Sequence, residues 1–256
     1  MKIIAIIPAR MGSSRFPGKP LAPILGRPMI EHVYRRTILC EALNDVFVAT
    51  CDTEIFESVE SFGGRAIMTS PAHDRASDRV AEAAADIDCD VVVMIQGDEP
   101  MTYPAMIEES LAPFLGGDEA VSCVNLTAKI KNQKEFKDPN TIKVVMDRDG
   151  YAIYMSREPI PTLHLQDFNQ IPAFKQVCVI PFSAAALQEF NKLDPTPLEV
   201  AESIDMMRFI EHGRKVKMVE TSFSTHAVDN PADLKRVEEL LRKDALTQKY
   251  VKPIEQ

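Results

Sequence analysis

Residues 3–19 read IIAIIPARMGSSRFPGK, an apolar run that breaks into a loop with three cations and two glycines. The run Ile3 to Ile7 is typical of a buried strand. Backbone N–H groups freed by the turn can converge on an anion together with the side chains of Arg10, Arg15 and Lys19. The stretch therefore indicates a polyphosphate site at the end of a strand, and with it nucleotide chemistry.

The loop does not match the common nucleotide motifs. A P-loop has four residues between its first glycine and Gly-Lys, followed by Ser or Thr. Here five residues separate Gly12 from Gly18, and Lys19 is followed by Pro20, which has neither a hydroxyl nor a backbone N–H. The dinucleotide pattern G-x-G-x-x-G is missing as well. A different kind of phosphate-binding loop is indicated.

Short apolar or β-branched runs alternate with stretches of helical length in the first half of the chain. Such alternation predicts a doubly wound α/β fold with a mostly parallel sheet. We expect strands at 3–7, 46–50, 66–68, 91–95 and 120–124. We expect helices at about 28–42, 54–62, 77–85 and 103–115.

The pattern changes after about residue 131, which indicates a small inserted lobe at approximately 131–182. β-like runs in this part cover 142–146, 151–155 and 177–180. Further elements are then expected, namely helices at 184–191, 197–212 and 231–243 and a strand at 216–220.

Composition narrows the class of protein. The chain has 256 residues, 45% hydrophobic content and a formal net charge of −9. That length suits one large domain, and the negative charge argues against binding nucleic acid or an anionic membrane. Five cysteines without CxxC spacing read as reduced thiols. Because the N-terminal apolar run is too short for a secretory signal, we expect a cytoplasmic protein.

Several blocks of sequence carry a resemblance to one known family. They are residues 7–21 (IPARMGSSRFPGKPL), 26–30 (GRPMI), 48–52 (VATCD), 68–73 (MTSPAH) with 77–79 (SDR), 96–100 (QGDEP) and 228–234 (VDNPADL). In this order they closely resemble the CMP-Kdo synthetases, or 3-deoxy-manno-octulosonate cytidylyltransferases. The resemblance implies one nucleotidyltransferase domain over 1–256, like that of nucleotide-diphospho-sugar transferases, with the lobe at 131–182 serving acceptor binding and dimerisation.

Four side chains are the candidates for catalysis. Lys19 and Arg15 are expected to hold triphosphate oxygens. Asp98 lies in a turn after a buried strand, where a carboxylate can reach Mg²⁺; alternatively, it bonds its own turn. The resemblance implies Asp229 as the second Mg²⁺ ligand. As the alternative, Asn230 before Pro231 looks like the N-cap of a helix, and Asp229 would only stabilise the positive end of that helix.

A further set of residues is expected to bind the nucleotide, and for all of them except Ser13 and Gln96 the resemblance implies recognition of the cytidine of CTP. This set comprises Ala9, Arg10, Ser13, Thr50, Asp52, Ser77, Arg79 and Gln96. The family's Ser-Gly-Thr-Asp-Arg stretch reads Arg75-Ala-Ser-Asp-Arg79 here, without the glycine. For Ser77 and Asp78, capping of a helix is the alternative.

The acceptor candidates are Arg157, Gln176, Asp205 and, again, Gln96. Arg157 resembles a family arginine near the sugar acid, and a guanidinium pairs well with a carboxylate; a surface loop arginine is the alternative. A histidine and two tyrosines of the family are replaced by Gln176, Ile180 and Phe182, and a polar residue by Met206. Met206 itself is expected to pack a helix, with pocket lining as the alternative. Loss of polar groups should change substrate choice.

The sequence therefore predicts a Mg²⁺-dependent cytidylyltransferase that couples CTP to a 3-deoxy-2-keto sugar acid, Kdo or a Kdo-like acid, and releases pyrophosphate. The resemblance implies a homodimer. Two alternatives stay open at this point. One is a nucleotidyltransferase for a different acidic or amidated capsular sugar, and the other is a non-catalytic regulatory protein that binds a nucleotide.

Overall fold

The computed structural model describes residues 1–12, 15–117, 121–164 and 167–251. The chain divides into two compact units. The first combines Met1–Glu108 with Thr225–Gln256, and the second is Glu109–Ser224. The second unit contains the segment 131–182, whose predicted roles in acceptor binding and dimerisation stay predictions.

The first unit is built on parallel strands. Four of them run in the order β6-β1-β4-β5, and all three pairings are parallel. Their bounds are Ile3–Ala9 for β1, Asp45–Thr50 for β4, Ala66–Met68 for β5 and Val91–Ile95 for β6. All of β1 and β6 is buried, which explains why both read as continuous apolar runs. The predicted α/β fold with a mostly parallel sheet is confirmed.

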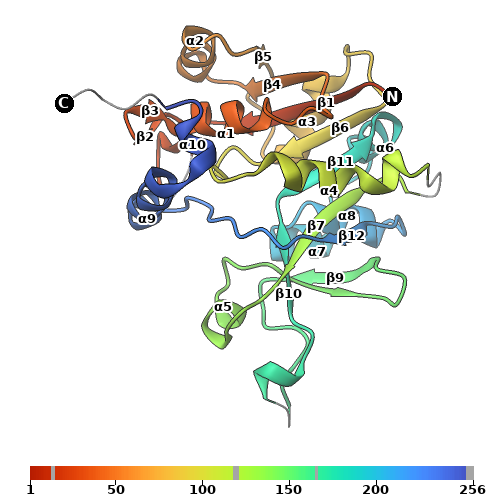
Figure 1. The fold of residues 1–256 in the computed structure, drawn as a ribbon. Helices are drawn as coiled ribbons and strands as arrows, with labels where there is room; N and C mark the ends of the chain where they lie inside the picture. The colour runs from red at the N-terminus through yellow and green to blue at the C-terminus, as the bar shows by residue number, and fades with distance from the viewer. Residues whose placement is uncertain (13–14, 118–120, 165–166, 252–256) are drawn as a thin grey trace. The chain divides into compact units, whose positions relative to one another are not determined.

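A helix follows each of these strands along the chain (Figure 1). These helices are α1 (Met29–Thr37), α2 (Thr53–Ser61), α3 (Ala76–Ala84) and α4 (Pro104–Leu115). A one-turn 3-10 helix, η1 (Lys19–Leu21), and a short hairpin, β2 (Pro23–Ile24) with β3 (Arg27–Pro28), precede α1. The prediction for α1 was too long, because the α-helix ends at Thr37, whose hydroxyl donates to the Val33 carbonyl at 2.8 Å.

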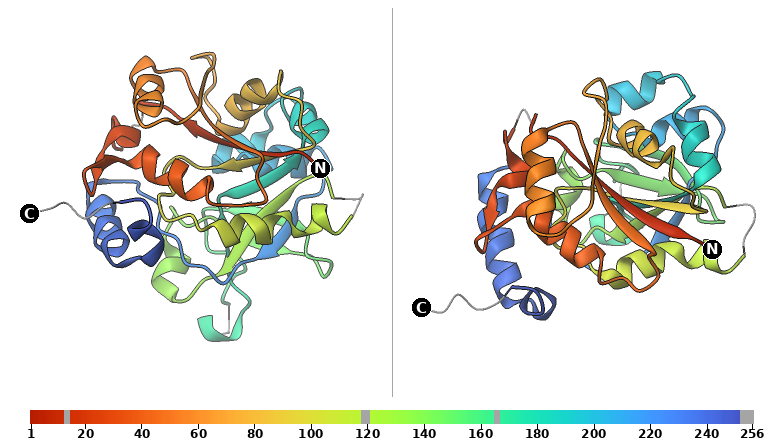
Figure 2. Two further views of the ribbon diagram at one scale, coloured as in Figure 1. Left: turned by 45° about the horizontal axis from the view of Figure 1, so that its top comes forward. Right: turned by 90° about the horizontal axis from the view of Figure 1, so that it is seen from above.

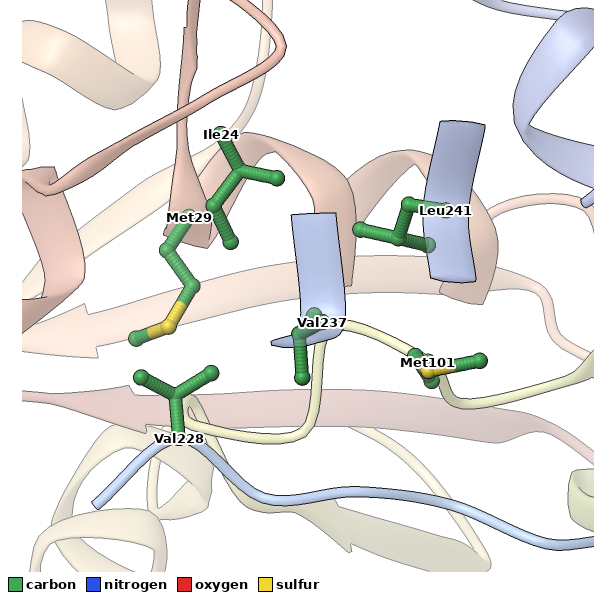
Figure 3. Close-up of a cluster of buried hydrophobic side chains, with 6 residues drawn as sticks. All are labelled: Ile24, Met29, Met101, Val228, Val237 and Leu241. Atoms are coloured by element: carbon green, nitrogen blue, oxygen red, sulfur yellow. The ribbon is translucent and has the colours of Figure 1, made fainter. Parts of the chain in front are cut away.

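The C-terminal segment returns to the first unit as α9 (Pro231–Lys243) and α10 (Ala245–Gln248). Both views in Figure 2 show these blue helices beside the red and orange β2, β3 and α1. A buried cluster joins them, as Figure 3 shows. Its members are Ile24, Met29, Met101, Val228, Val237 and Leu241. Apolar packing therefore ties the two ends of the chain together.

The second unit contains a mixed sheet in the order β12-β7-β10-β8-β9. The strands are β7 (Val124–Lys129), β8 (Lys143–Met146), β9 (Ala152–Ser156), β10 (Phe174–Val177) and β12 (Lys217–Glu220). The predicted strand at 120–124 was misplaced, since β7 begins at Val124. Polar Asn125 and Thr127 hid this strand from an apolar pattern. Asn125 is nevertheless buried, and its amide donates to the Leu126 and Val177 carbonyls at 2.9 and 2.8 Å.

The remaining elements of the second unit are α5 (Gln133–Lys137), η2 (Phe168–Gln170), β11 (Val179–Ser183), α6 (Ala184–Phe190), α7 (Pro197–Glu202) and α8 (Met206–Glu211). The predicted single helix at 197–212 is wrong. Ser203 has φ of 54°, a left-handed conformation that ends α7. Arg208 on α8 then reaches back to Glu199 on α7 with bonds of 2.7 and 2.8 Å, both side chains being buried.

None of the helices in the described part of the chain combines the length and the apolar character that crossing a bilayer requires.

Candidate active site

Two neighbouring strand ends form the base of the candidate site. After β6 the chain turns through Gln96-Gly-Asp-Glu, closed by the Glu99 N–H to the Gln96 carbonyl at 3.2 Å. A Cβ on Gly97 would lie 2.6 Å from the carbonyl oxygen of Pro8 on β1. Only glycine allows this approach, so the turn that carries Asp98 lies directly against the end of β1.

The loop after β1 brings Lys19 to this turn. Gly18 takes φ of 71°, and its N–H donates to the Met11 carbonyl at 3.0 Å, which closes the loop. The Lys19 ammonium donates to Asp98 Oδ2 at 2.7 Å, and its side chain is only 13% exposed. Two segments that the sequence singled out separately therefore meet.

Asp229 joins the same cluster from the C-terminal segment. The Val228 N–H donates to the main-chain carbonyl of Asp98 at 2.9 Å. This bond places Asp229 Oδ1 3.9 Å from the Lys19 ammonium and 2.9 Å from Arg15 Nη2. The four predicted catalytic residues form one cluster of two cations and two carboxylates.

The helix behind Asp229 is capped by other residues. Asn230 Oδ1 accepts from the N–H groups of Ala232 and Asp233 at 2.9 and 3.1 Å. Asp233 Oδ2 accepts from the N–H groups of Asp229 and Asn230 at 3.0 and 3.1 Å. This reciprocal capping box leaves the Asp229 carboxylate directed to Arg15 and Lys19.

Some predicted nucleotide residues support the loop from the next strand. Asp52, after β4, accepts the Met11 N–H through Oδ2 at 2.7 Å, and its own N–H donates to the Thr50 hydroxyl at 3.1 Å. Arg10 pairs with Asp74 at 4.0 Å. Ala9 and Gln96 stand at the ends of β1 and β6, Ala9 buried and Gln96 half-buried. Their predicted contacts with CTP stay predictions.

Ser77 and Arg79 are buried on α3, and their side chains contact neighbouring segments of the first unit. Arg79 donates to the Ser70 and His73 carbonyls, each at 3.3 Å, and the Ser77 hydroxyl lies 3.8 Å from the Met94 sulfur. The alternative of helix capping by Ser77 is wrong, because α3 begins at Ala76 with Arg75 at the N-cap. Ser13 lies outside the described residues.

The acceptor candidate Arg157 lies in the second unit, at the end of β9. Its guanidinium donates to three main-chain carbonyls, those of Glu202 at 2.7 Å, Pro139 at 3.0 Å and Ser203 at 3.3 Å. The main-chain N–H of Arg157 donates to the Glu202 carboxylate at 2.8 Å. Burial acts to raise the pKa of Glu202, but the bonds that its carboxylate accepts from the Arg157 main-chain N–H, Ser156 and Tyr154, with the charge of Arg157, hold that pKa below its usual value. The arginine is therefore fixed rather than a mobile surface side chain.

Gln176 and Asp205, the other acceptor candidates of this unit, differ in setting. The Gln176 amide donates to Asn125 Oδ1 at 2.6 Å, so its orientation is set by the neighbouring strand β7. Asp205 stands at the N-cap of α8 in a helical conformation, without a capping bond from its side chain. Binding of an acceptor by either residue stays a prediction.

The departures from the family pattern lie partly in the core. Phe182 is fully buried against Phe190 and Phe209, with ring centroids 6.1 and 5.9 Å away. Met206 is fully buried as well, and Ile180 is 2% exposed. Ile180 and Phe182 fill the interior of the second unit, so the expectation that they alter a polar pocket is corrected. The expected packing of Met206 in a helix is confirmed. Gln176 alone among the four keeps a half-buried polar side chain.

Lys143 was missed by the sequence reasoning. It is fully buried on β8, and its ammonium donates to the carbonyls of Asp138 at 2.9 Å, Thr141 at 2.6 Å and Arg157. Burial lowers the pKa of this lysine. The only signal in the sequence was a lysine inside the apolar run Ile142-Lys-Val-Val-Met, which local patterns treat as an outward-facing residue.

Comparisons with known proteins agree with this arrangement. The model of the cytidylyltransferase family matches residues 4–220. A 3-deoxy-manno-octulosonate cytidylyltransferase of Geobacter metallireducens is 44% identical, covering 94% of this chain and 98% of the relative. An 8-amino-3,8-dideoxy-manno-octulosonate cytidylyltransferase of Shewanella sp. strain ANA-3 is 39% identical, covering 95% and 100%.

A solved structure extends the comparison to three dimensions. The structure of CMP:2-keto-3-deoxy-manno-octonic acid synthetase complexed with CTP matches with a TM-score of 0.87 and 36% identity, covering 95% of this chain and 99% of that chain. Fold, sequence and the meeting of Lys19 with Asp98 and Asp229 agree, and the chain belongs to the cytidylyltransferase family, with the 3-deoxy-manno-octulosonate cytidylyltransferases as its relatives.

Proposed function

We propose that this chain transfers a cytidylyl group from CTP to 3-deoxy-manno-octulosonate. The anomeric hydroxyl oxygen of the sugar acid attacks the α-phosphorus, and the bond to the β-phosphate breaks. CMP-sugar and pyrophosphate leave, and the hydroxyl proton passes to solvent. One observation carries the proposal for this chain, the cluster of Lys19, Arg15, Asp98 and Asp229 at the ends of β1 and β6. Ligands of open parallel sheets bind at such strand ends.

Lys19 and Arg15 are suited to the triphosphate. A lysine supplies a compact charge on a flexible stem, and an arginine supplies a planar fork for two phosphate oxygens. Because phosphoryl transfer needs little covalent help, positioning and charge stabilisation account for most of the catalysis. Both cations already lie in one cluster, so little reorganisation is required of the chain.

Asp98 and Asp229 fit a divalent cation. Carboxylate oxygens are the ligands that Mg²⁺ prefers, and a cation, the Lys19 ammonium, lies against both of them. The described residues contain no group of three or more His, Cys, Asp or Glu that could hold a metal. Phosphate oxygens and water would therefore complete the coordination. When bound, Mg²⁺ would neutralise charge on the phosphates.

Arg157 is proposed to face the carboxylate of the sugar acid. Within the described part of the chain, three of its five N–H donors bond carbonyls, so two can serve an anion. The relative that acts on an 8-amino acid makes the 8-amino-3,8-dideoxy acid a second candidate acceptor. The homodimer remains part of this proposal, to be checked by light scattering.

The test is pyrophosphate release by the full chain with Mg²⁺. Reactions combine CTP, UTP or ATP with 3-deoxy-manno-octulosonate, its 8-amino analogue or no acceptor. We expect release that requires both CTP and an octulosonate. Release with UTP at the same rate would reject the cytidine assignment, and absence of release with every acceptor would favour a non-catalytic nucleotide-binding protein.

A further inference from the structure

The Lys19 ammonium lies where the two carboxylates of the candidate site come together. It is 2.7 Å from Asp98 Oδ2 and 3.9 Å from Asp229 Oδ1. The three side chains are 13%, 29% and 25% exposed, so water screens them only in part. Arg15 adds a second cation, 2.9 Å from the same Asp229 oxygen. The two acids are thus paired with cations of the protein itself.

We propose that the Lys19 ammonium competes with a divalent cation for Asp98 and Asp229. The cation then binds weakly until a bound nucleotide attracts Lys19 to its phosphates. The inference rests on the proposed function, because it takes the triphosphate as the new partner of Lys19. An ammonium and a divalent cation repel each other strongly at such separations in a partly buried site. The ammonium already lies at one oxygen of each carboxylate, Asp98 Oδ2 and Asp229 Oδ1, so a divalent cation on the pair competes with it for the same negative charge.

The surrounding backbone restricts the exchange to the side chain. The Lys19 N–H donates to the Phe16 carbonyl at 3.2 Å, and its carbonyl accepts from Ala22 at 3.1 Å. Pro20 follows within η1, and Gly18 precedes it in a left-handed turn. The four-carbon stem of a lysine can swing its charge while this backbone stays in place. Release of the acids therefore needs no rearrangement of the loop.

The consequence is positive coupling between metal and nucleotide. A triphosphate that attracts Lys19 exposes the acids to the cation, and a cation on the acids frees Lys19 for the phosphates. Linkage makes the two effects equal in size. The same competition lowers the affinity for the metal when no nucleotide is bound. Metal and nucleotide should therefore bind cooperatively.

The experiment measures Mn²⁺ binding to the nucleotide-free full chain by electron paramagnetic resonance of the free ion. We compare the wild type with Lys19→Met and Lys19→Gln, which remove the charge. Arg10→Met is the matched control, because it also removes one cation from this loop. Arg10 pairs with Asp74 and not with the two acids of the site. The double variant Lys19→Met with Asp98→Asn tests whether any gain arises at the acidic pair. Circular dichroism verifies that each variant folds.

We expect the two Lys19 variants to bind Mn²⁺ roughly tenfold more tightly than the wild type. Arg10→Met should stay within about twofold, and the double variant should lose the gain. Equal or weaker Mn²⁺ binding by both folded Lys19 variants would overturn the inference, as would an equal gain in Arg10→Met. Because no turnover is involved, this result is separate from pyrophosphate release, which tests the proposed function.

Discussion

Lys19, Arg15, Asp98 and Asp229 compensate one another's charge, so each substitution among them changes the field felt by the others. Asp98 is the central member, because its side chain bonds Lys19 while its carbonyl holds Val228 and thereby Asp229. A change in its carboxylate alters the charge of the site, whereas the main-chain bond is retained. A substitution of Asp98 therefore tests the role of its charge while the main-chain bond that positions Val228 is kept.

Asp98→Asn should lower the rate of pyrophosphate release about 100-fold or more while the fold survives, because an amide cannot supply the anionic ligand. Release is measured with CTP and the octulosonate, and folding by circular dichroism. Asp86→Asn, an exposed change of equal charge in the same unit, should have the wild-type rate. An Asp98→Asn protein with near-normal activity would remove Asp98 from its proposed role.

Gly97→Ala tests the close approach of the two strand ends. Its Cβ would lie 2.6 Å from the Pro8 carbonyl oxygen, so the Asp98 turn must shift away from β1. We expect a loss of about 1–3 kcal/mol in the free energy of unfolding, measured with urea. Gly12→Ala is the control, because a Cβ there meets nothing within 4 Å. Equal stability of the two variants would contradict the steric argument.

The C-terminal helices form the element that delivers Asp229 to the site. Val237 and Leu241 of α9 pack with Ile24 and Met101, next to the segments that carry Lys19 and Asp98. At the end of α9, Asp244 pairs with Arg36 of α1 at 2.7 Å, and Arg36 is fully buried. The position of Asp229 thus depends on apolar packing and on one buried ion pair.

Asp244→Ala should destabilise the first unit by about 3–5 kcal/mol, since it leaves the Arg36 guanidinium buried without its carboxylate. Urea unfolding followed by circular dichroism gives the value. Glu238→Ala removes a largely exposed pair with Arg242 on the same helix and should cost less than about 1 kcal/mol. Similar losses in the two variants would show that burial of Arg36 does not determine the cost.

At the scale of the whole molecule, stability responds to pH through buried groups. His32 is fully buried between Ile24 and Tyr250. Its Nε2 lies 2.8 Å from the Ile24 carbonyl, which can only accept, so Nε2 carries the proton and Nδ1 accepts from the Tyr250 hydroxyl at 2.9 Å. Burial lowers the pKa of His32 from 6.5 to about 4, helped by Arg36 and Arg27 and opposed by the Ile24 bond and Glu31.

The sign of the pH effect follows from these two pKa values. Between pH 6.5 and about 4 the unfolded chain takes up a proton at His32 that the folded chain does not, so stability falls as pH falls, by up to about 3 kcal/mol. Urea unfolding at pH 7.5 and about 4.5 measures the loss. His32→Gln should reduce this loss, and exposed His212→Gln should leave it unchanged. An unchanged loss in His32→Gln would exclude His32 as its source.

The candidate residues are also distributed over the whole molecule. Lys19, Asp98 and Asp229 belong to the first unit, while Arg157 and Gln176 belong to the second. Substitutions in the two units should therefore affect different kinetic constants. Nucleotide and metal dependence should follow the first unit, and acceptor dependence the second.

Arg157→Lys should raise the KM for the octulosonate roughly tenfold or more and leave the KM for CTP near normal. A lysine cannot bond three carbonyls in one plane and still present two donors to a carboxylate. Steady-state kinetics of pyrophosphate release gives both constants. Arg214→Lys, an exposed change in the same unit, is the control. A raised KM for CTP alone would place Arg157 on the nucleotide instead.

Local sequence patterns predicted the strands correctly where burial produces a continuous apolar run, as in β1 and β6. They failed where a polar residue is buried for a tertiary reason. Asn125 lies inside β7 because its amide finds carbonyl partners, and Ser203 breaks the helix at 197–212 by adopting a left-handed conformation. Lys143 escaped notice because its three carbonyl partners come from two separate segments.

The sequence by itself determined the parallel strands, the cationic loop after β1 and the family, because apolar runs and short motifs are local properties. Only the tertiary structure decided that Asp229 meets Lys19 and that Phe182 is a core residue. These outcomes depend on packing between segments far apart in the chain, such as Val228 and Leu241 against Ile24. No run of neighbouring residues encodes such contacts, since their energy exists only once the segments are folded together.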